Sequence, residues 1–202
     1  MRVSMLVMNE MRGDARVMRE ARSLALVGHE VEVFALRHPG LPDVEDGGGF
    51  TIRRVADFTV ASLRQPVRKL RERRAREDAL RAAVLDSAPD VVHCHDTNTL
   101  GIGASAARTL SVPYIYDAHE LYPDSLTQRP FQGSAPVQAY LRAVERRSVP
   151  GAASVITVCD GASAVLHERY GVEPIVVANC PDRVPIADRG LLKRSLGLAP
   201  ES

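Results

Sequence analysis

Short hydrophobic runs along this chain alternate with longer stretches in which hydrophobic positions recur every three or four residues. The first pattern is typical of buried β-strands and the second of helices with one buried face. The patterns predict strands at 3–8, 29–36, 51–55, within 89–96, within 112–121, 155–158 and 175–178, and helices at 14–28, 63–87, 97–110, 136–148 and 160–170. Because strands and helices alternate, we expect an α/β fold of three layers, α/β/α, around a mainly parallel sheet of about seven strands.

Turn-forming and capping residues support these boundaries. Asp14 is placed to cap the first helix, and Gly28 ends it. Residues 38–49 are rich in Gly and Pro, which favours a loop, and Pro89 follows the end of the long second helix. We therefore interpret residues 1–182 as one domain.

The last twenty residues do not fit that domain. Pro181 and Pro185 follow the last predicted strand, and a short helical pattern at 189–198 has no strand to pack against. We interpret residues 183–202 as a linker and the start of a second, carboxyl-terminal domain.

Charge and cysteine content limit the partners and the compartment. Lys and Arg total 26 against 25 Asp and Glu, so the net charge of +1 gives no argument for a nucleic-acid partner. Cys94, Cys159 and Cys180 are widely spaced and form no C-x-x-C pair, which favours a reducing, cytoplasmic location. No window approaches the ~18 apolar residues of a membrane span.

Polar side chains end two of the predicted strands. His95 and Asp96 close the fourth strand, and Asp117, His119 and Glu120 close the fifth. In an open α/β sheet, ligands bind in the crevice beyond the carboxyl ends of the strands. We therefore expect these five side chains to contribute to one site.

Metal binding is an alternative for part of this set. His93 and His95 share one face of a strand, and Asp96, His119 and Glu120 add further ligand types. We expect no metal, because these ligands would come from loosely placed strand ends, and we expect His93 to lie in the core.

Several of the candidate residues also have structural roles open to them. His119 could tether a neighbouring loop, and Asp117 and Glu120 could cap helices or anchor loops. Asp160 lies before a helix, so it is either a helix cap or part of a site in which backbone N–H groups bind an anion.

The second predicted helix is rich in arginine. Between Arg64 and Arg81 there are eight basic and three acidic residues. This pattern fits attachment to an anionic membrane surface, where each basic side chain contributes about 1 kcal/mol. The alternative is a solvated helix face beside the sheet.

Five stretches carry a family resemblance when their order and spacing are taken together. They are DARVMREARSLALVGHEV at 14–31, PDVVHCHD at 89–96, VPYIYDAHEL at 112–121, VITV at 155–158 and VVANCPD at 176–182. Together they resemble the amino-terminal, acceptor-side domain of the glycosyltransferase family 4 enzymes, which share the two-domain GT-B fold. The resemblance implies that residues 1–182 form a Rossmann-like half of that fold.

The resemblance also implies an activity. Similar enzymes transfer a sugar from a nucleotide-sugar donor to an acceptor, with retention of configuration, and need no cofactor. The acceptor would be a sugar or a lipid-linked molecule, and the enzyme would be cytoplasmic or peripheral at the inner face of the membrane. The donor is held mainly by a carboxyl-terminal domain, so this chain would be inactive alone.

Site residues carry over onto matching positions only. In similar enzymes the His at the position of His119 points into the cleft between the domains, so His119 is the expected catalytic residue. The loop after the first strand lines the same cleft, here with Asn9, Glu10 and Gly13, where the family often has a Gly-Gly pair. The other expected cleft residues are His95, Asp96, Asp117, Glu120 and Asp160.

Other protein classes remain to be weighed against this one. A stand-alone binding module, or one subunit of a split glycosyltransferase, would keep the fold without catalysing transfer alone. A dinucleotide enzyme is disfavoured, because the first turn lacks G-x-G-x-x-G and holds a single Gly13. A nucleophilic hydrolase is disfavoured as well, because there is no G-x-S-x-G and the adjacent Cys94 and His95 would point to opposite faces of a strand.

Overall fold

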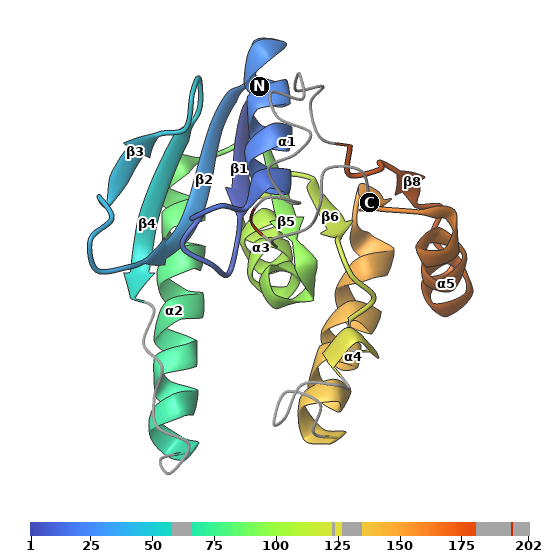
Figure 1. Ribbon diagram of the computed structural model, residues 1–202. Helices are drawn as coiled ribbons and strands as arrows, with labels where there is room; N and C mark the ends of the chain where they lie inside the picture. Colours follow the sequence, from blue (N-terminus) through green and yellow to red (C-terminus); the bar gives the residue numbers. More distant parts are fainter. Residues whose placement is uncertain (58–65, 123, 127–134, 181–194, 196–202) are drawn as a thin grey trace.

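An eight-stranded sheet with helices on both faces forms this protein (Figure 1). The computed structural model describes residues 1–57, 66–122, 124–126, 135–180 and 195. The strand order is β3-β4-β2-β1-β5-β6-β7-β8, and all described pairs are parallel except β3 with β4. The strands are β1 (Arg2–Leu6), β2 (Glu30–Arg37), β3 (Val44–Asp46), β4 (Thr51–Asp57), β5 (Val91–His95), β6 (Tyr114–Ala118), β7 (Ser154–Thr157) and β8 (Ile175–Val176).

Five α-helices are described in this part of the chain. They are α1 (Ala15–Leu26), α2 (Pro66–Ser87), α3 (Asp96–Leu110), α4 (Ala135–Ser148) and α5 (Asp160–Tyr170), with short 3-10 turns at Asp124–Leu126 and Val149–Gly151. Helix α1 covers one face of the sheet, and α2 and α3 cover the opposite face (Figure 1). The expected three-layer arrangement is confirmed.

The side-chain alternation of β1 explains how this strand serves both faces. Met5 and Val7 belong to the cluster that includes Val17 and Ala21 of α1, whereas Leu6 packs into the cluster with Leu100 of α3. Successive residues of a strand point to opposite faces, so a strand with helices on both sides is hydrophobic throughout. The run at 3–8 therefore predicts a central strand, and β1 does pair with both β2 and β5.

Two of the sequence boundaries need adjustment. The segment at 38–49 is not all loop, because β3 pairs antiparallel with β4 through a turn in which Gly48 and Gly49 have φ near +90°. Strand β3 was missed because it has three residues and only one of them, Val44, is hydrophobic. Helix α3 begins at Asp96 and not at Thr97.

Two expectations fall on parts of the chain that the structure does not describe. The helix expected from residue 63 is described from Pro66 onward. The linker and the short helix expected within 183–202 lie outside the described residues except for Ser195. The domain boundary at 182 therefore stays a prediction.

Candidate active site

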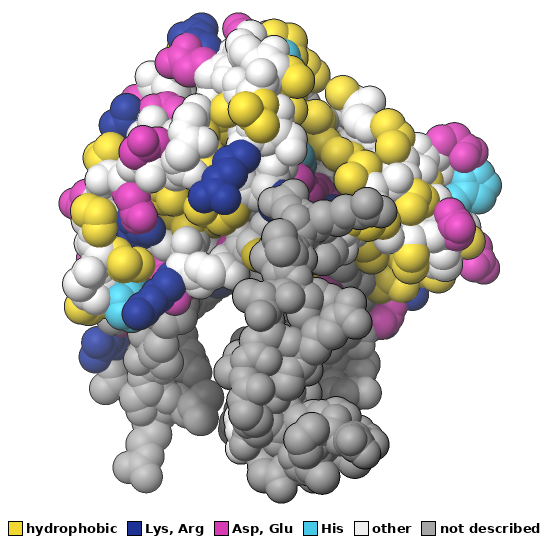
Figure 2. All heavy atoms as spheres, turned by 45° about the horizontal axis from the view of Figure 1, so that its top comes forward, with side chains coloured by type: hydrophobic (Ala, Val, Ile, Leu, Met, Phe, Trp, Pro, Cys, Tyr) yellow, Lys and Arg dark blue, Asp and Glu magenta, His cyan; other side chains and the backbone are white. Residues whose placement is uncertain are grey.

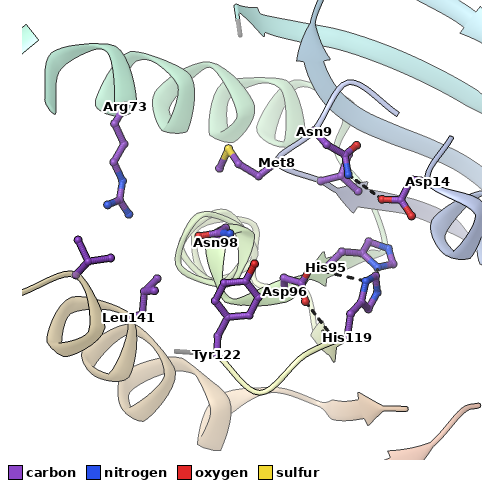
Figure 3. Close-up of a pocket in the computed structure, with 12 residues that line it drawn as sticks. Met8, Asn9, Asp14, Arg73, His95, Asp96, Asn98, His119, Tyr122 and Leu141 are labelled. Carbon is purple, nitrogen blue, oxygen red and sulfur yellow. Dashed lines mark hydrogen bonds and ion pairs between the residues drawn. The ribbon is translucent and has the colours of Figure 1, made fainter. Parts of the chain in front are cut away.

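The carboxyl ends of β1, β5 and β6 meet at one edge of the sheet. Leu6 pairs in register with Cys94, and His95 pairs with Asp117, so the residues that follow these strands are neighbours. Strand order reverses between β1 and β5, and such a switch point is where an open α/β sheet binds ligands. A pocket of about 420 Å³ opens there (Figure 3), lined by Val7, Met8, Asn9, Asp14, Arg73, His95, Asp96, Asn98, His119, Tyr122, Val137 and Leu141.

Asp117 lies beneath this pocket and is the centre of a buried polar cluster. Its side chain is fully buried, its Oδ1 lies 2.8 Å from Arg16 Nη2, and its Oδ2 lies 3.3 Å from His119 Nε2 and 3.6 Å from His93 Nε2. Burial alone would raise the pKa of Asp117, but the close contacts with His119 and His93 and the charges of the nearby imidazoles bring it well below its ordinary value. Asp117 is therefore ionised and orients its neighbours without forming the pocket wall.

Three imidazoles surround Asp117, and the pKa values of two of them, His95 and His119, are shifted in opposite directions. His93 and His95 stack with ring centroids 4.3 Å apart, and both are buried. Burial and the neighbouring His93 hold the pKa of His95 well below its ordinary value, so this ring is neutral. Burial also acts to lower the pKa of His119, but its close contact with Asp117 and the charges of Asp96 and Asp117 raise it above its ordinary value. His119 therefore holds a proton more readily than His95 does.

Asp96 joins this cluster to the pocket wall. It starts α3 with φ at +61°, a left-handed backbone conformation that costs energy for a residue other than glycine. Its Oδ1 accepts a 3.2 Å hydrogen bond from the backbone N–H of His119. Burial raises the pKa of Asp96 to about 6, with His119 opposing the shift. Strained backbone conformations of this kind cluster at functional sites.

The loop after β1 supplies the opposite wall of the pocket. Asn9 donates a 2.7 Å hydrogen bond to Asp14 Oδ2 and accepts one of 2.8 Å from the backbone N–H of Met11. Asp14 also caps α1 by accepting from the N–H of Val17, as the sequence predicts. Asn9 therefore lies where we expect a cleft residue, held in place by the helix cap.

Five predicted cleft residues are not among those that line the described pocket: Asp117 lies beneath it, and the other four lie elsewhere. Glu10 uses its backbone carbonyl to accept from Arg54, and Gly13, at φ +79°, forms the turn into α1. Glu120 is exposed beyond β6, and Asp160 is exposed at the start of α5. The structure therefore brings together Asn9, His95, Asp96 and His119, with Asp117 underneath.

Sequence reasoning missed two charged residues of the cluster, both on α1. Arg16 contacts Asp117, and its Nε lies 2.8 Å from Glu20 Oε1. Burial and the proximity of Asp117 raise the pKa of Glu20 to about 8, although Arg16 opposes the shift. The sequence held one indication of these two residues. Arg16 and Glu20 are one helical turn apart, so they lie on the same side of α1, and Arg16 is next to Val17, which is buried.

The apolar part of the pocket was missed as well. Met8, Tyr122, Val137 and Leu141 also line it, and Leu141 lies at the end away from His119 (Figure 3). These residues come from the segment after β1, the segment after β6, and α4. Only tertiary packing brings them together, so no local pattern marks them.

Comparison with solved structures defines the class of protein. Sucrose-phosphate synthase from Thermosynechococcus elongatus has a TM-score of 0.74 at 17% identity, over 99% of this chain and 53% of that chain. HepE from Anabaena, solved with UDP-glucose, has a TM-score of 0.63 at 18% identity, over 98% of this chain and 50% of that chain. SsfS6, a glycosyltransferase from Streptomyces sp. SF2575, has a TM-score of 0.53 at 18% identity, over 81% of this chain and 51% of that chain. The fold is that of one Rossmann-like half of a GT-B glycosyltransferase, and the chain spans about half the length of these proteins.

The family follows from the sequence itself. Residues 14–182 match Glycosyltransferase Family 4, and this chain belongs to that family. The resemblance found in the five sequence stretches is confirmed. Comparison with curated proteins gave no match.

Proposed function

We propose that this chain is the acceptor-side half of a glycosyltransferase that moves a sugar from a nucleotide-sugar donor to an acceptor with retention of configuration. Family membership supports transferase chemistry. Structures of similar fold were solved with UDP-glucose in HepE and with thymidine diphosphate in SsfS6. The observation that carries the proposal is the pocket at the β1, β5 and β6 ends, where His119, Asp96 and Asn9 meet.

In this proposal His119 binds the transferring sugar or the acceptor at the polar end of the pocket. Its side chain is 17% exposed, and Asp117 below fixes the ring. Asn9 and Asp96 shape the acceptor pocket, and Asp117 is a positioning residue. The second domain of the intact enzyme closes the cleft and excludes water, and its fixed hydrogen-bond donors stabilise the charge on the leaving diphosphate.

Turnover by two versions of the protein tests this proposal. We expect this chain alone to be inactive with UDP- and TDP-sugars, and a version extended through the following domain to transfer sugar. His119→Ala in the longer version should then lower kcat/KM by at least about 100-fold, which corresponds to about 2.7 kcal/mol of transition-state stabilisation. His167→Ala, which changes an exposed histidine of α5, is the matched control.

Two results would contradict the proposal. Near-normal rates in the His119→Ala variant would remove His119 from its assigned role. Nucleotide-sugar binding without transfer in the longer version would favour the stand-alone binding module, and activity restored by a separate second chain would identify a split enzyme.

Membrane attachment through α2 is a further part of this proposal. Arg71 and Arg74 are exposed, whereas Arg73 pairs with Glu77 at 2.6 Å and Arg81 donates to Ser105 and Thr109 of α3. Arg64 lies outside the described residues. No described helix is long and apolar enough to cross a membrane.

Flotation with liposomes tests this attachment. We expect recovery with anionic vesicles that exceeds recovery with neutral ones and that falls in an Arg71→Gln/Arg74→Gln variant. Equal recovery with both vesicle types would leave α2 as a solvated helix. Basic side chains also lie elsewhere on the described surface (Figure 2). Attachment is therefore assigned to α2 only if the Arg71→Gln/Arg74→Gln substitutions lower the recovery with anionic vesicles.

A further inference from the structure

We propose that Glu20, His95, Asp117 and His119 bind one divalent transition-metal ion of the zinc class. One donor atom from each residue lies within 4.8 Å of all the others. His95 Nδ1 is 3.1 Å from His119 Nε2, 3.6 Å from Asp117 Oδ2 and 3.8 Å from Glu20 Oε2, and His119 Nε2 is 3.3 Å from Asp117 Oδ2. Ligands bonded tetrahedrally at 2.0–2.2 Å are about 3.3–3.6 Å apart. The distances among His95, Asp117 and His119 are therefore close to those of a zinc coordination shell, and Glu20 lies within 4.8 Å of all three.

The two carboxylates each leave one buried oxygen without a hydrogen bond inside this shell. Asp117 Oδ2 and Glu20 Oε2 are inaccessible to solvent and have no hydrogen-bond partner, and Asp117 is fully buried. A buried carboxylate oxygen without a partner is costly. Both unpartnered oxygens face the two imidazole nitrogens, which is the donor set that zinc and its neighbours prefer.

Arg16 occupies the outer oxygens of the same carboxylates and does not enter the shell. It contacts Glu20 Oε1 and Asp117 Oδ1, each at 2.8 Å, and these are not the oxygens that face the imidazoles. Metal-binding carboxylates are typically held by such outer contacts, which fix their orientation. The guanidinium therefore prepares the site by orienting two ligands at once.

His119 has an outer partner of the kind that metal-bound histidines use. Its Nδ1 lies 3.7 Å from Asp96 Oδ2, on the side of the ring away from the cluster. A metal on Nε2 leaves the proton on Nδ1, so the ring presents an N–H donor next to Asp96 at the pocket (Figure 3). This tautomer suits the hydrogen-bonding role proposed for His119, although metal binding itself does not depend on that role.

The cluster can be reached from the face that carries α1. Glu20, Arg16 and His93 line a second pocket of about 510 Å³, whose other wall includes Ile156 and Asn179. His95 and His119 line the first pocket. An ion can therefore enter beside Glu20, the most exposed of the four ligands, without unfolding of the sheet.

This ligand set differs from the one considered from the sequence. His95 and His119 are shared, but Glu20 and Asp117 take the places of His93, Asp96 and Glu120. Asp96 lies outside the shell as the partner of His119 Nδ1, and His93 stacks on His95. The strand ends are not loosely placed, because Arg16 and Asp117 fix them.

Cobalt titration tests the proposal without any substrate. The protein is the full chain with Cys159→Ser and Cys180→Ser, since those two thiols are exposed and would bind the same ions. After treatment with a chelator, Co²⁺ is added while visible absorption is recorded. We expect the intense bands of tetrahedral Co²⁺ to saturate at one ion per chain and to disappear when one equivalent of Zn²⁺ is added.

Three variants separate metal binding from a purely structural ion-pair cluster. Glu20→Gln and His119→Ala should each weaken Co²⁺ binding at least about tenfold, and His167→Ala should leave it unchanged. Far-UV circular dichroism checks that each variant folds. If His119→Ala does not fold, Glu20→Gln still tests the site, because glutamine keeps the shape of the glutamate side chain. Absence of the tetrahedral bands, or unchanged affinity in Glu20→Gln, would overturn the proposal and leave a cluster neutralised by a protonated His119. Neither result would bear on sugar transfer.

Discussion

Thr97 Oγ1 donates a 2.7 Å hydrogen bond to Glu145 Oε1 and so joins the first turn of α3 to α4. Glu145 is 1% exposed and accepts two more hydrogen bonds, from the hydroxyls of Tyr116 and Tyr170. One buried carboxyl group therefore connects α3, β6, α4 and α5. Thr97 follows Asp96, and Tyr116 precedes Asp117, so this connection also positions the cluster below the pocket.

The unfolding free energy should depend on pH through Glu145. Burial raises its pKa above the ordinary value of 4.5, against the three hydroxyl donors, which lower it. The native state thus keeps a proton on Glu145 that the unfolded chain releases, so the stabilisation is present below about pH 4.5 and is lost as pH rises through the raised value. In Glu145→Gln this contribution is absent.

Urea unfolding followed by circular dichroism at several pH values measures the difference between the two proteins. We expect the difference in unfolding free energy between the wild type and Glu145→Gln, which favours the wild type at low pH, to shrink as the pH rises above 4.5. A difference that grows with pH would show that the hydroxyl donors, and not burial, control this carboxyl group.

Two glycines of α3 should respond oppositely to the same substitution. A Cβ at Gly103 would lie 2.2 Å from Cys94 Sγ and 3.1 Å from Val92 Cγ1, whereas a Cβ at Gly101 meets only Val144 Cγ1 at 3.4 Å. We expect Gly103→Ala to destabilise by about 1–3 kcal/mol through overpacking. Gly101→Ala should be neutral or stabilise by up to about 1 kcal/mol, because alanine favours the helix.

Unfolding free energies in urea measure both effects. A Cys94→Ala/Gly103→Ala double variant should lose less than the sum of the single variants, since the alanine at 94 removes the clashing sulfur. Strict additivity would show that Gly103 is required for another reason.

The sequence predicted the polar half of the site because that half depends on local rules. His95 and Asp117 end adjacent parallel strands, and parallel strands deliver their carboxyl ends to one edge of a sheet. Asn9 was expected from the family resemblance, which places the loop after the first strand at the cleft, and it does line the pocket. Asp14 was predicted as a cap, and it both caps α1 and holds Asn9.

The remaining parts of the fold and site depend on contacts between distant segments. Arg16 and Asp117 are 101 positions apart, and nothing in the sequence of α1 names the strand that it faces. Leu141 joins the pocket only because α4 packs beside α3. Strand β3 forms because β4 offers it an edge, since its own residues have little strand preference.

The three thiols should differ in reactivity. Burial raises the pKa of Cys94 to about 12, and this residue is fully buried, whereas Cys159 and Cys180 are exposed. At pH 8 we expect iodoacetamide to modify two cysteines of the native protein and all three after unfolding, because the thiolate is the reactive form. Mass spectrometry counts the adducts, and a Cys159→Ser/Cys180→Ser variant should take up none while folded. Rapid labelling of Cys94 in that variant would show that the sheet opens at β5.

Loss of Arg16 should leave the buried Asp117 carboxylate without its arginine partner. Arg16 is 8% exposed and contacts Asp117, which is fully buried, and Glu20, which is 21% exposed. We expect Arg16→Met to lower the unfolding free energy by about 3–5 kcal/mol, the cost of an uncompensated buried charge. Arg16→Lys should recover only part of this, since an ammonium group lacks the planar fork that reaches both carboxylates.

Urea unfolding at pH 7 measures these losses. The control is Arg19→Met, which changes an arginine on the same helix whose partner is the uncharged Asn179, and its effect should stay within about 1 kcal/mol. Arg16→Met/Asp117→Asn should be more stable than Arg16→Met alone, because the second substitution removes the stranded charge. A small loss in Arg16→Met would mean that His119 alone neutralises Asp117, and Arg16 would then not be the residue that orients the two carboxylates.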